Sequence, residues 1–402
     1  MKKGQTEGHA ETLGSRRESS WQTKPLEEVC NVEYGTRVVQ KRDGGKGFPV
    51  YGGGGATFEM DGFNREDRLV IARFGMSEEC TRFVAGKFFL NDSGLTVSPK
   101  NGAMHQRFLD YQMLALNDDI YALGKGTAQK NLDVPVFRTV PLFVPESLAE
   151  QQRIVVLLDE AFAGLATAKA NAEKNLQNAR ALFESHLQSV FTQRGQGWVE
   201  TTIGELCDIK HGYAFDGAEF SNDVPDGNPL VVTPGNFTED GKLLFNERNT
   251  KRFSGSTPAG FQFGIGDLVV VMTDLSSKMK ILGKPAFVET DDVLHNQRIG
   301  RLVFLTDRVE KRLLYYFMMT EGFLKNIKMS STGTMVKHTA PKRIMSNVIP
   351  FPANRKEQRA IVTTLDDLRE ETQRLARLYE RKRAALEALK KSLLHQAFTG
   401  EL

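Results

Sequence analysis

Two separated segments could together supply the carboxylates of a metal-dependent nuclease. Pro225-Asp226, followed by Asp240-Gly241-Lys242, fits the loose motif whose carboxylates hold Mg²⁺ between paired strands. Both segments also carry an Asp-Gly pair, and the first continues with Asn228-Pro229, and these pairs favour turns over strands. We therefore interpret them as turns. The seven histidines show no metal-ligand spacing, so the sequence predicts no metal site.

Two glycine-rich runs could bind phosphate or a cofactor. The run 51–55 (YGGGG) lacks the Gly-Lys-Ser/Thr ending of a nucleotide-binding loop, so we predict a turn that approaches DNA or protein. The run 263–266 (FGIG) could belong to the cofactor loop of a methyltransferase, but no Asn-Pro-Pro-Tyr or Asp-Pro-Pro-Tyr occurs in the chain. We predict a turn before a strand that begins at Asp267. The sequence thus predicts no catalytic residue and no cofactor in this chain.

The elements that position these side chains are repeated. Trp21 and Trp198 are 177 residues apart, and so are Cys30 and Cys207. Two pairs of rare residues with one spacing indicate an internal repeat. Towards the end of each copy the offset is 207, so the second copy carries about 30 extra residues in its middle. Constant ends around a variable middle indicate different targets carried on one frame.

Each copy has its own mixture of strands and helices. Residues 26–35 and 203–212 alternate apolar and polar positions, which predicts an opening strand ended by glycine in both copies. Further strands are predicted at 67–74 and 267–272, and helices at about 106–116 and 309–319. We therefore predict an α+β fold, with two globular domains in tandem.

A long helix is predicted at the end of each copy. Ser147 with Glu150, and Asn354 with Glu357, form capping boxes, and no proline follows up to Phe191 or Phe398. Roughly 45 helical residues would span about 67 Å. We divide the chain into a mobile tail (1–20), a first domain (21–147), a first helix (148–192), a second domain (193–354) and a second helix (355–402).

Apolar residues with alternating spacings of four and three predict a coiled-coil seam on both helices. The seam positions are Ile154, Leu158, Ala161, Leu165, Ala168, Ala172, Asn175, Ala179, Leu182 and His186, and then Ile361, Leu365, Leu368, Thr372, Leu375, Tyr379, Lys382, Leu386, Leu389 and Leu393. The alanine-rich seam suits the leucine-rich one, so we predict that the helices form an antiparallel coiled coil. Asn175 and Lys382 either lie near a solvated edge or fix the register.

The arrangement resembles the specificity (S) subunit of type I restriction–modification systems over essentially the whole chain after the tail. The most specific residues are 126–132 (GTAQKNL) and 145–159 (PESLAEQQRIVVLLD), with 333–338 and 352–366 as second copies. The glycine run 51–55 is also similar to a loop of such recognition domains.

The resemblance implies that each domain recognises one half of a bipartite, asymmetric site in double-stranded DNA. The helices would set the gap between the halves and dock two methyltransferase (M) subunits, and restriction (R) subunits would add cleavage. S-adenosylmethionine, ATP and Mg²⁺ would be bound by those partners, which methylate adenine at N6 and cut DNA. Half-sites that face one side of B-DNA lie about 34 Å apart, which a rod of this length can span.

Side chains in predicted loops that suit base edges or phosphate are the DNA-binding candidates. In the first domain they are Arg37, Lys41, Arg42, Tyr51, Arg73, Lys125, Thr127, Gln129, Lys130 and Asn131. In the second they are Tyr213, Thr233, Asn236, Lys278, Lys280, Gln297, Arg298, Thr334, Lys337 and His338. Recurrence of the 126–131 loop has a second explanation, a turn that the fold requires.

Two other functions stay open at this point: a coiled-coil adaptor that binds no DNA, and a self-sufficient DNA methyltransferase or nuclease. The net charge of +3 excludes a polybasic protein, and the surplus lies mainly on the second helix rather than on the domains. We therefore expect weak DNA binding by the chain alone. Three cysteines without a Cys-x-x-Cys pair are expected to be buried, and the chain has no signal peptide and no membrane span, so we expect a cytoplasmic protein.

Overall fold

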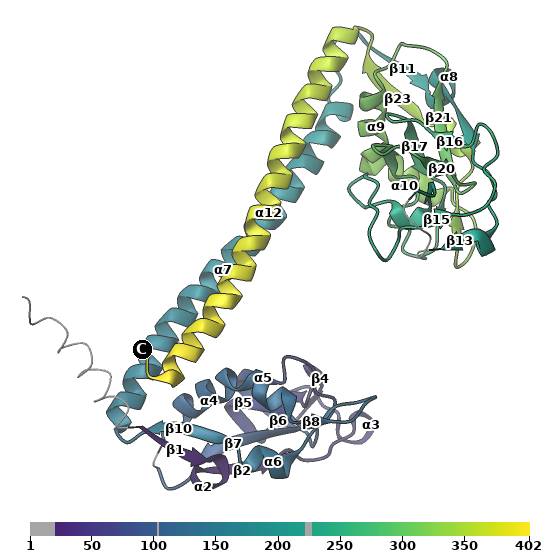
Figure 1. The fold of residues 1–402 in the computed structure, drawn as a ribbon. Coiled ribbons are helices and arrows are strands. Elements are labelled where there is room, and N and C mark those ends of the chain that lie inside the picture. The colour runs from purple at the N-terminus through teal and green to yellow at the C-terminus, as the bar shows by residue number, and fades with distance from the viewer. Residues whose placement is uncertain (1–20, 103, 222–226) are drawn as a thin grey trace, which may run out of the picture. The chain divides into compact units, whose positions relative to one another are not determined.

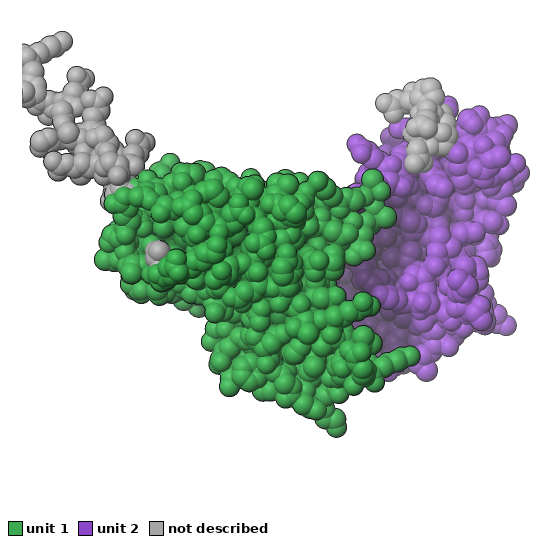
Figure 2. Space-filling view, turned by 90° about the horizontal axis from the view of Figure 1, so that it is seen from below, with its two compact units in different colours: residues 1–174, 379–402 green, residues 175–378 purple. Residues whose placement is uncertain are grey.

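The chain divides into two compact units in a computed structural model, which describes residues 21–102, 104–221 and 227–402. Unit 1 comprises residues up to Lys174 together with Tyr379–Leu402, and unit 2 comprises Asn175–Leu378 (Figure 2). Each unit therefore contains a globular domain and parts of both long helices. The tail predicted for residues 1–20 lies outside the described residues.

A six-stranded sheet forms the frame of unit 1, with strand order β2-β7-β5-β6-β3-β4 (Figure 1). The strands are β2 (Cys30–Tyr34), β3 (Phe48–Tyr51), β4 (Ala56–Met60), β5 (Arg65–Ala72), β6 (Thr81–Leu90) and β7 (Gly94–Pro99). The helices are α2 (Leu26–Val29), α3 (Gln40–Asp43), α4 (Gln106–Ala115), α5 (Asn117–Ala122) and α6 (Val134–Arg138). The last residues of β5 are apolar and buried, and Phe108 on α4 packs in the same core. Apolar runs on both elements thus close this core.

The two larger sheets of unit 2 have strand orders β12-β21-β17-β19 and β13-β15-β14-β20-β16. Their strands are β12 (Cys207–His211), β13 (Phe220–Ser221), β14 (Leu230–Val232), β15 (Arg252–Phe253), β16 (Gln262–Phe263), β17 (Leu268–Val271), β19 (Pro285–Phe287), β20 (Val293–His295) and β21 (Ile299–Phe304). The helices are α8 (Ile203–Leu206), α9 (Lys311–Met319), α10 (Glu321–Met329) and α11 (Pro341–Met345), with short 3₁₀ turns η1 (Gly217–Glu219) and η2 (Pro234–Asn236). Most of the extra residues of the second copy lie between β14 and β17.

A two-stranded antiparallel ribbon links each domain to its long helix. In unit 1, β1 (Trp21–Pro25) pairs with β10 (Pro141–Pro145). In unit 2, β11 (Trp198–Thr202) pairs with β23 (Val348–Pro352), with Trp198 opposite Pro352 as Trp21 is opposite Pro145. The repeated tryptophans therefore mark the first residue of the same ribbon in both copies.

The opening strand predicted for residues 26–35 and 203–212 is partly wrong. Residues 26–29 and 203–206 form single helical turns, and the strand begins only at Cys30 and Cys207. In the second copy Ile203, Leu206 and Cys207 are all fully buried. Positions i, i+3 and i+4 share one face of a helix, so a helical turn buries all three where a strand would separate them.

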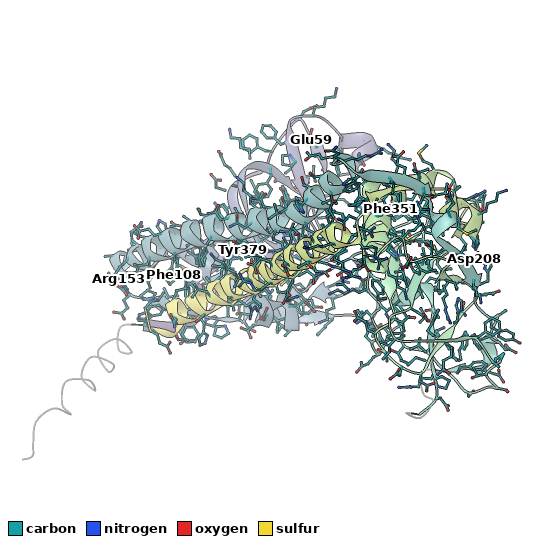
Figure 3. The ribbon with its side chains drawn as sticks, turned by 90° about the horizontal axis from the view of Figure 1, so that it is seen from above. Glu59, Phe108, Arg153, Asp208, Phe351 and Tyr379 are labelled. Carbon is teal, nitrogen blue, oxygen red and sulfur yellow. The ribbon has the colours of Figure 1, made fainter. Side chains whose placement is uncertain are left out.

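The two long helices are α7 (Leu148–Thr192) and α12 (Arg355–Thr399). They run antiparallel (Figure 1), and in unit 1 Glu173 and Arg383 form an ion pair of 3.2 Å between them. Phe398 of α12 packs on Phe108 with ring centroids 5.2 Å apart, and Arg153 of α7 donates a hydrogen bond to the carbonyl of Leu402 (2.9 Å). Phe108 and Arg153 are labelled in Figure 3, near the end of α12. The end of the chain thus completes the core of the first domain.

The predicted seam holds along much of both helices, where Ala172, Ala179 and Thr372 are also buried, and it fails at a few positions. Ile154, Leu158 and Leu365 are at most 1% exposed, whereas Leu182 is 53% exposed and Leu389 is 47% exposed. Ile361 and Leu393 are partly buried against the two cores. The remaining named leucines, Leu165, Leu368, Leu375 and Leu386, are half-buried, and Asn175 and Lys382 are exposed. The exposure of the last two favours the solvated edge over a register role.

The failure at Leu182 and Leu389 follows from helix geometry. A strict repeat of 3.5 residues drifts by about 20° per heptad on a straight helix of 3.6 residues per turn. Leu182 follows Ile154 by four heptads, and Leu389 follows Ile361 by four, so the drift reaches about 80°. That is close to the ~100° between successive residues. The buried face has accordingly moved, and Leu176 (6% exposed) lies on it.

A buried glutamine anchors the first turn of each long helix. Gln151 and Gln358 are both fully buried. The side chain of Gln358 accepts a hydrogen bond from the Glu310 amide and donates to the carbonyls of Pro352 and Arg308, each at 2.8 Å. Gln151 makes the equivalent bonds to the His105 amide (2.7 Å) and the Pro145 carbonyl (3.2 Å). Each glutamine thus joins ribbon, domain and helix.

All three cysteines are buried, as expected. Burial raises the pKa of the Cys30 and Cys207 thiols to about 12 and that of Cys80 to about 11. These thiols therefore stay protonated near neutral pH. Among the residues that the structure describes, no helix has the length and apolar character to cross a membrane.

Candidate nucleic-acid interface

Four loops and a hairpin meet at one edge of the sheet in unit 1. The loops follow β2, β3 and β5 and precede β7, and the hairpin joins β8 (Gly124–Lys125) to β9 (Asn131–Leu132). We call this set loop surface 1, residues 34–37, 51–55, 73–76, 91–93 and 125–131. Backbone hydrogen bonds join its parts: the Arg73 amide donates to Ser93 (2.9 Å), Met76 to Lys130 (2.9 Å), and Leu132 to Arg73 (2.8 Å). Its backbone is therefore fixed at several points.

Unit 2 presents the equivalent loops at the equivalent sheet edge. Loop surface 2 comprises residues 211–213, 233–235, 273–276, 296–298 and 332–338, and the strands β18 (Thr273–Asp274) and β22 (Lys337–His338) pair within it. The Gln297 amide donates to Tyr213 (2.9 Å), Met272 to Arg298 (3.0 Å), and Thr339 to Met272 (2.9 Å). The backbone connections match those of unit 1.

The two surfaces use the same local devices. Asn91 accepts a hydrogen bond from the Ser93 amide (2.9 Å), and Asn296 accepts one from the Arg298 amide (3.1 Å). Gly126 and Gly333 open the repeated turns with φ of 115° and 95°, a region that favours glycine. A Cβ at either position would collide with the carbonyl oxygen three residues later. The turn is thus a requirement of the fold, while its outward side chains remain free to differ.

The side chains on loop surface 1 differ in how firmly they are held. Arg37, Thr127 and Gln129 are exposed, and Arg73 and Tyr51 are half-buried. Lys125 forms an ion pair with Asp133 (2.5 Å), and the Lys130 ammonium lies 3.8 Å from the centroid of the Tyr121 ring. Asn131 accepts a hydrogen bond from the Gly75 amide (3.3 Å). The structure therefore brings these candidates together.

Six candidates converge on loop surface 2, namely Tyr213, Gln297, Arg298, Thr334, Lys337 and His338. Tyr213 is 41% exposed and packs edge-on against Phe215. The Lys337 ammonium donates to the Gly333 carbonyl (2.7 Å), and the His338 ring shares a hydrogen bond with the Thr273 hydroxyl (3.0 Å). Thr233 lies at the same edge, after β14, and donates to the Asn236 amide oxygen (2.9 Å).

The prediction that Asn236 contacts DNA is wrong. Its side chain is fully buried and holds the inserted loop by donating to the carbonyls of Leu244 (3.3 Å) and Asn249 (3.2 Å). The position of Asn236 in a glycine-rich turn suggested an exposed amide that contacts bases. The buried carbonyls of the loop need hydrogen-bond donors, however, and the Asn236 side chain supplies them. Its role is therefore to shape the loop.

Four basic candidates lie outside the loop surfaces or are already paired. Lys41 and Arg42 are on α3, which packs against the edge strand β4, and Arg42 makes two hydrogen bonds to Asp43 (2.8 and 2.9 Å). Lys280 forms an ion pair with Glu239 (2.6 Å). Lys278 is exposed in the loop after β18. Lys41, Arg42 and Lys280 therefore lie on α3 or are paired, whereas Lys278 stays an exposed candidate beside loop surface 2, where its amide donates to the Ser276 hydroxyl (3.2 Å).

Several residues of the surfaces were missed at the sequence level. Tyr34 and Phe74 flank Arg73, and Asn91 and Asn296 shape the two loops. His295 lies under loop surface 2, where burial lowers its pKa to about 4, so the ring is neutral near pH 7 and accounts for no positive charge there. Position at a strand end was the available signal for Tyr34 and Phe74, which lie at the ends of the strands predicted at 26–35 and 67–74.

The runs that could have carried chemistry have structural roles. Gly52 and Gly53 are buried, and the Gly53 amide donates to the Ser93 hydroxyl (3.1 Å). The run 263–266 forms a turn in which the Gly264 amide donates to the Asp267 carboxylate (2.9 Å). Asp226 lies outside the described residues, and Asp240 is exposed beside Gln373 of α12. Within the described ranges, no group of three or more His, Cys, Asp or Glu side chains could hold a metal ion.

The fold and its two loop surfaces define a tandem-repeat recognition protein with equivalent frames and different outward side chains. The chain belongs to the type I restriction modification DNA specificity domain family, whose profile matches residues 18–176 and again 195–380. The two matches each cover one domain and the adjoining part of a long helix.

Individual relatives agree with this family. The chain is 22% identical over 339 residues to the type I restriction enzyme MjaVIII specificity subunit of Methanocaldococcus jannaschii, covering 79% of this chain and 76% of that protein. It is 24% identical over 236 residues to the type I restriction enzyme EcoBI specificity subunit of Escherichia coli, covering 59% of this chain and 43% of that protein.

Solved structures share the fold. A chain from a structure of a type I R–M system, solved for its complex assembly and conformational transition, has a TM-score of 0.71 at 17% identity and covers 95% of this chain and 98% of that one. The HsdS subunit from Thermoanaerobacter tengcongensis has a TM-score of 0.53 at 17% identity, covering 95% and 97%.

Proposed function

We propose that the chain is the DNA-recognition subunit of a type I restriction–modification complex, with each domain recognising one half of a bipartite, asymmetric site. The observation that supports this most is the pair of loop surfaces. Both stand on the same strand ends and the same glycine turns, yet they present different side chains, with Arg73 and Gln129 on one and Tyr213, Gln297 and Arg298 on the other. Two domains with the same backbone frame but different outward side chains are suited to recognising two different half-sites.

The long helices would set the gap between half-sites and dock methyltransferase subunits. In this proposal residues 21–147 and 193–354 are the recognition domains, and 148–192 and 355–402 are the spacer helices. Their matching lengths of 45 residues support a ruler. Methylation of adenine N6 and ATP-dependent cleavage would belong to partner subunits, which would bind S-adenosylmethionine, ATP and Mg²⁺.

Selection from random-sequence duplexes tests the proposal. The full chain, assembled with its methyltransferase subunit, should enrich two fixed base groups separated by a constant gap. The chain alone should bind more weakly, because the net charge is only +3 and its surplus lies on α12. No enrichment with or without the partner would indicate an adaptor instead. Methyl transfer by the chain alone would indicate a self-sufficient enzyme.

A second test concerns the ruler. Seven residues inserted into both helices at matched positions should lengthen the gap and leave both half-sites unchanged. The same insertion into only one helix should misalign the seam and weaken recognition. An unchanged gap after the matched insertion would contradict the ruler role.

A further inference from the structure

Arg73 stands at the centre of loop surface 1, directly after the buried strand β5. Its guanidinium carbon lies 4.9 Å from the centroid of the Tyr34 ring and 4.5 Å from that of the Phe74 ring. One of its nitrogens also donates to the Asp92 carbonyl (3.4 Å). Planar guanidinium groups stack on aromatic faces and lose mobility when they do. The side chain is therefore held in one orientation.

The surroundings leave room for a ligand next to this guanidinium. Tyr34 is 43% exposed and Phe74 is 38% exposed, so both rings reach solvent beside the arginine. Gly54 has no neighbour within 4 Å of its would-be Cβ, and the exposed Gln129 approaches Gly75. Among the described residues, the Asp92 carbonyl is the one hydrogen-bond acceptor of the Arg73 guanidinium, so other N–H groups of its fork remain available.

We infer that Arg73 determines specificity in the first half-site by recognising a guanine. The inference rests on the proposed function and names a base for that site. A guanine presents O6 and N7 in the major groove as a pair of acceptors, which matches the fork of a fixed arginine. A phosphate contact needs charge but not a fixed plane, and an exposed cation such as Arg37 satisfies it equally. The two flanking rings thus favour base recognition over phosphate binding.

Unit 2 lacks this device at the equivalent position. Met272 occupies in unit 2 the position that Arg73 occupies in unit 1. The Arg73 carbonyl accepts a hydrogen bond from the Leu132 amide (2.8 Å), and the Met272 carbonyl accepts one from the equivalent Thr339 amide (2.9 Å). Met272 is buried. Its backbone amide donates to the carbonyl of Arg298, whose charged side chain is exposed. The inference therefore applies to one half-site, and Arg73→Ala should leave the other unchanged.

The test is duplex selection with the full chain and its methyltransferase subunit, comparing wild type with Arg73→Ala, Arg73→Lys and Tyr34→Phe. Arg73→Ala should lose about 10- to 100-fold of discrimination at one guanine of one half-site. Arg73→Lys should lose most of it, because an ammonium lacks the fork, and Tyr34→Phe should keep it, because the ring face is retained. Lys87→Ala is the control and should match wild type, because Lys87 is an exposed cation 4.6 Å from the centroid of the Phe63 ring and lies opposite Glu66, at the other end of β5 from Arg73.

Each other outcome is decisive. Equal weakening on all sequences by Arg73→Ala would identify a phosphate contact and overturn the inference, as would relaxation at a base other than guanine or at none. Full discrimination by Arg73→Lys would also contradict it. Failure of the wild-type complex to select a bipartite site would instead refute the proposed function. Unchanged circular dichroism of each variant confirms that the comparison is between folded proteins.

Discussion

The position of the seam on α7 can be tested by truncating one leucine on the buried face and one on the predicted face. Leu176 is 6% exposed, so Leu176→Ala removes a packed side chain, and such changes cost about 2–5 kcal/mol. Leu182 is 53% exposed, and alanine is the better helix former, so Leu182→Ala should cost below about 1 kcal/mol. We expect about 3 kcal/mol for the first variant, because a helix pair is narrower than a domain core.

Hydrogen exchange measured by mass spectrometry reports this locally, without assuming that the two units unfold together. A loss of 3 kcal/mol accelerates exchange of the amides in 175–192 by about 150-fold, whereas Leu182→Ala should accelerate it by less than about 5-fold. Leu394→Ala (5% exposed) and Leu389→Ala (47% exposed) repeat the comparison on α12. Equal acceleration by Leu176→Ala and Leu182→Ala would refute the drift argument and restore the strict heptad seam.

Four further predictions concern individual residues. Burial lowers the pKa of His295 to about 4 from an ordinary value of 6.5, so the stability that the neutral ring gives unit 2 is present above pH 6.5 and is lost as the pH falls towards 4. Urea titration followed by Trp198 fluorescence in a Trp21→Phe background should show a loss of about 3 kcal/mol over that range, and an equal loss in His295→Gln would contradict it. Gly164→Ala should stabilise α7 by up to about 1 kcal/mol in thermal unfolding, because a Cβ there has no neighbour within 4 Å. Gly126→Ala should weaken recognition of one half-site by distorting a turn with φ of 115°, and unaltered selection by this variant would argue against a role for the turn. The three buried thiols should react with a disulfide reagent only on unfolding, and fast labelling of the native chain would contradict their raised pKa values.

The repeated frame could be predicted because its landmarks are rare residues with fixed neighbours. Trp21 and Trp198 each open a ribbon, and Cys30 and Cys207 each begin a strand in the core of their own unit. Such positions depend on local sequence and on burial, which the chain displays directly. The fold class and the antiparallel helices followed from these landmarks and from the apolar spacing.

The errors arose where a local pattern has two physical outcomes. The alternation of apolar and polar residues around Leu26 fits a strand, whereas the spacing of four residues between Leu26 and Cys30 fits a helical turn. The turn forms because it packs Leu26 against the core. Leu182 suits a heptad seam only if the helices are underwound to 3.5 residues per turn. Asn236 has the composition of an exposed loop, but the inserted segment folds back and buries it.

The candidate site was predictable in its residue types and not in its arrangement. Arg73 was identifiable as a charged residue after a buried strand, but the rings of Tyr34 and Phe74 read as core residues in a linear sequence. Loops that lie up to about 90 residues apart in the sequence converge because the strands of the sheet are ordered β2-β7-β5-β6-β3-β4.

Methylome sequencing of cells that express this chain with the proposed methyltransferase partner tests the central claim most directly. The account predicts methylated adenines in one bipartite motif with two different half-sites and a constant gap. Exchange of residues 125–131 together with Arg73 for those of a relative should change one half-site and leave the other and the gap unaltered. A single contiguous motif, or a change in both half-sites after that exchange, would contradict the account.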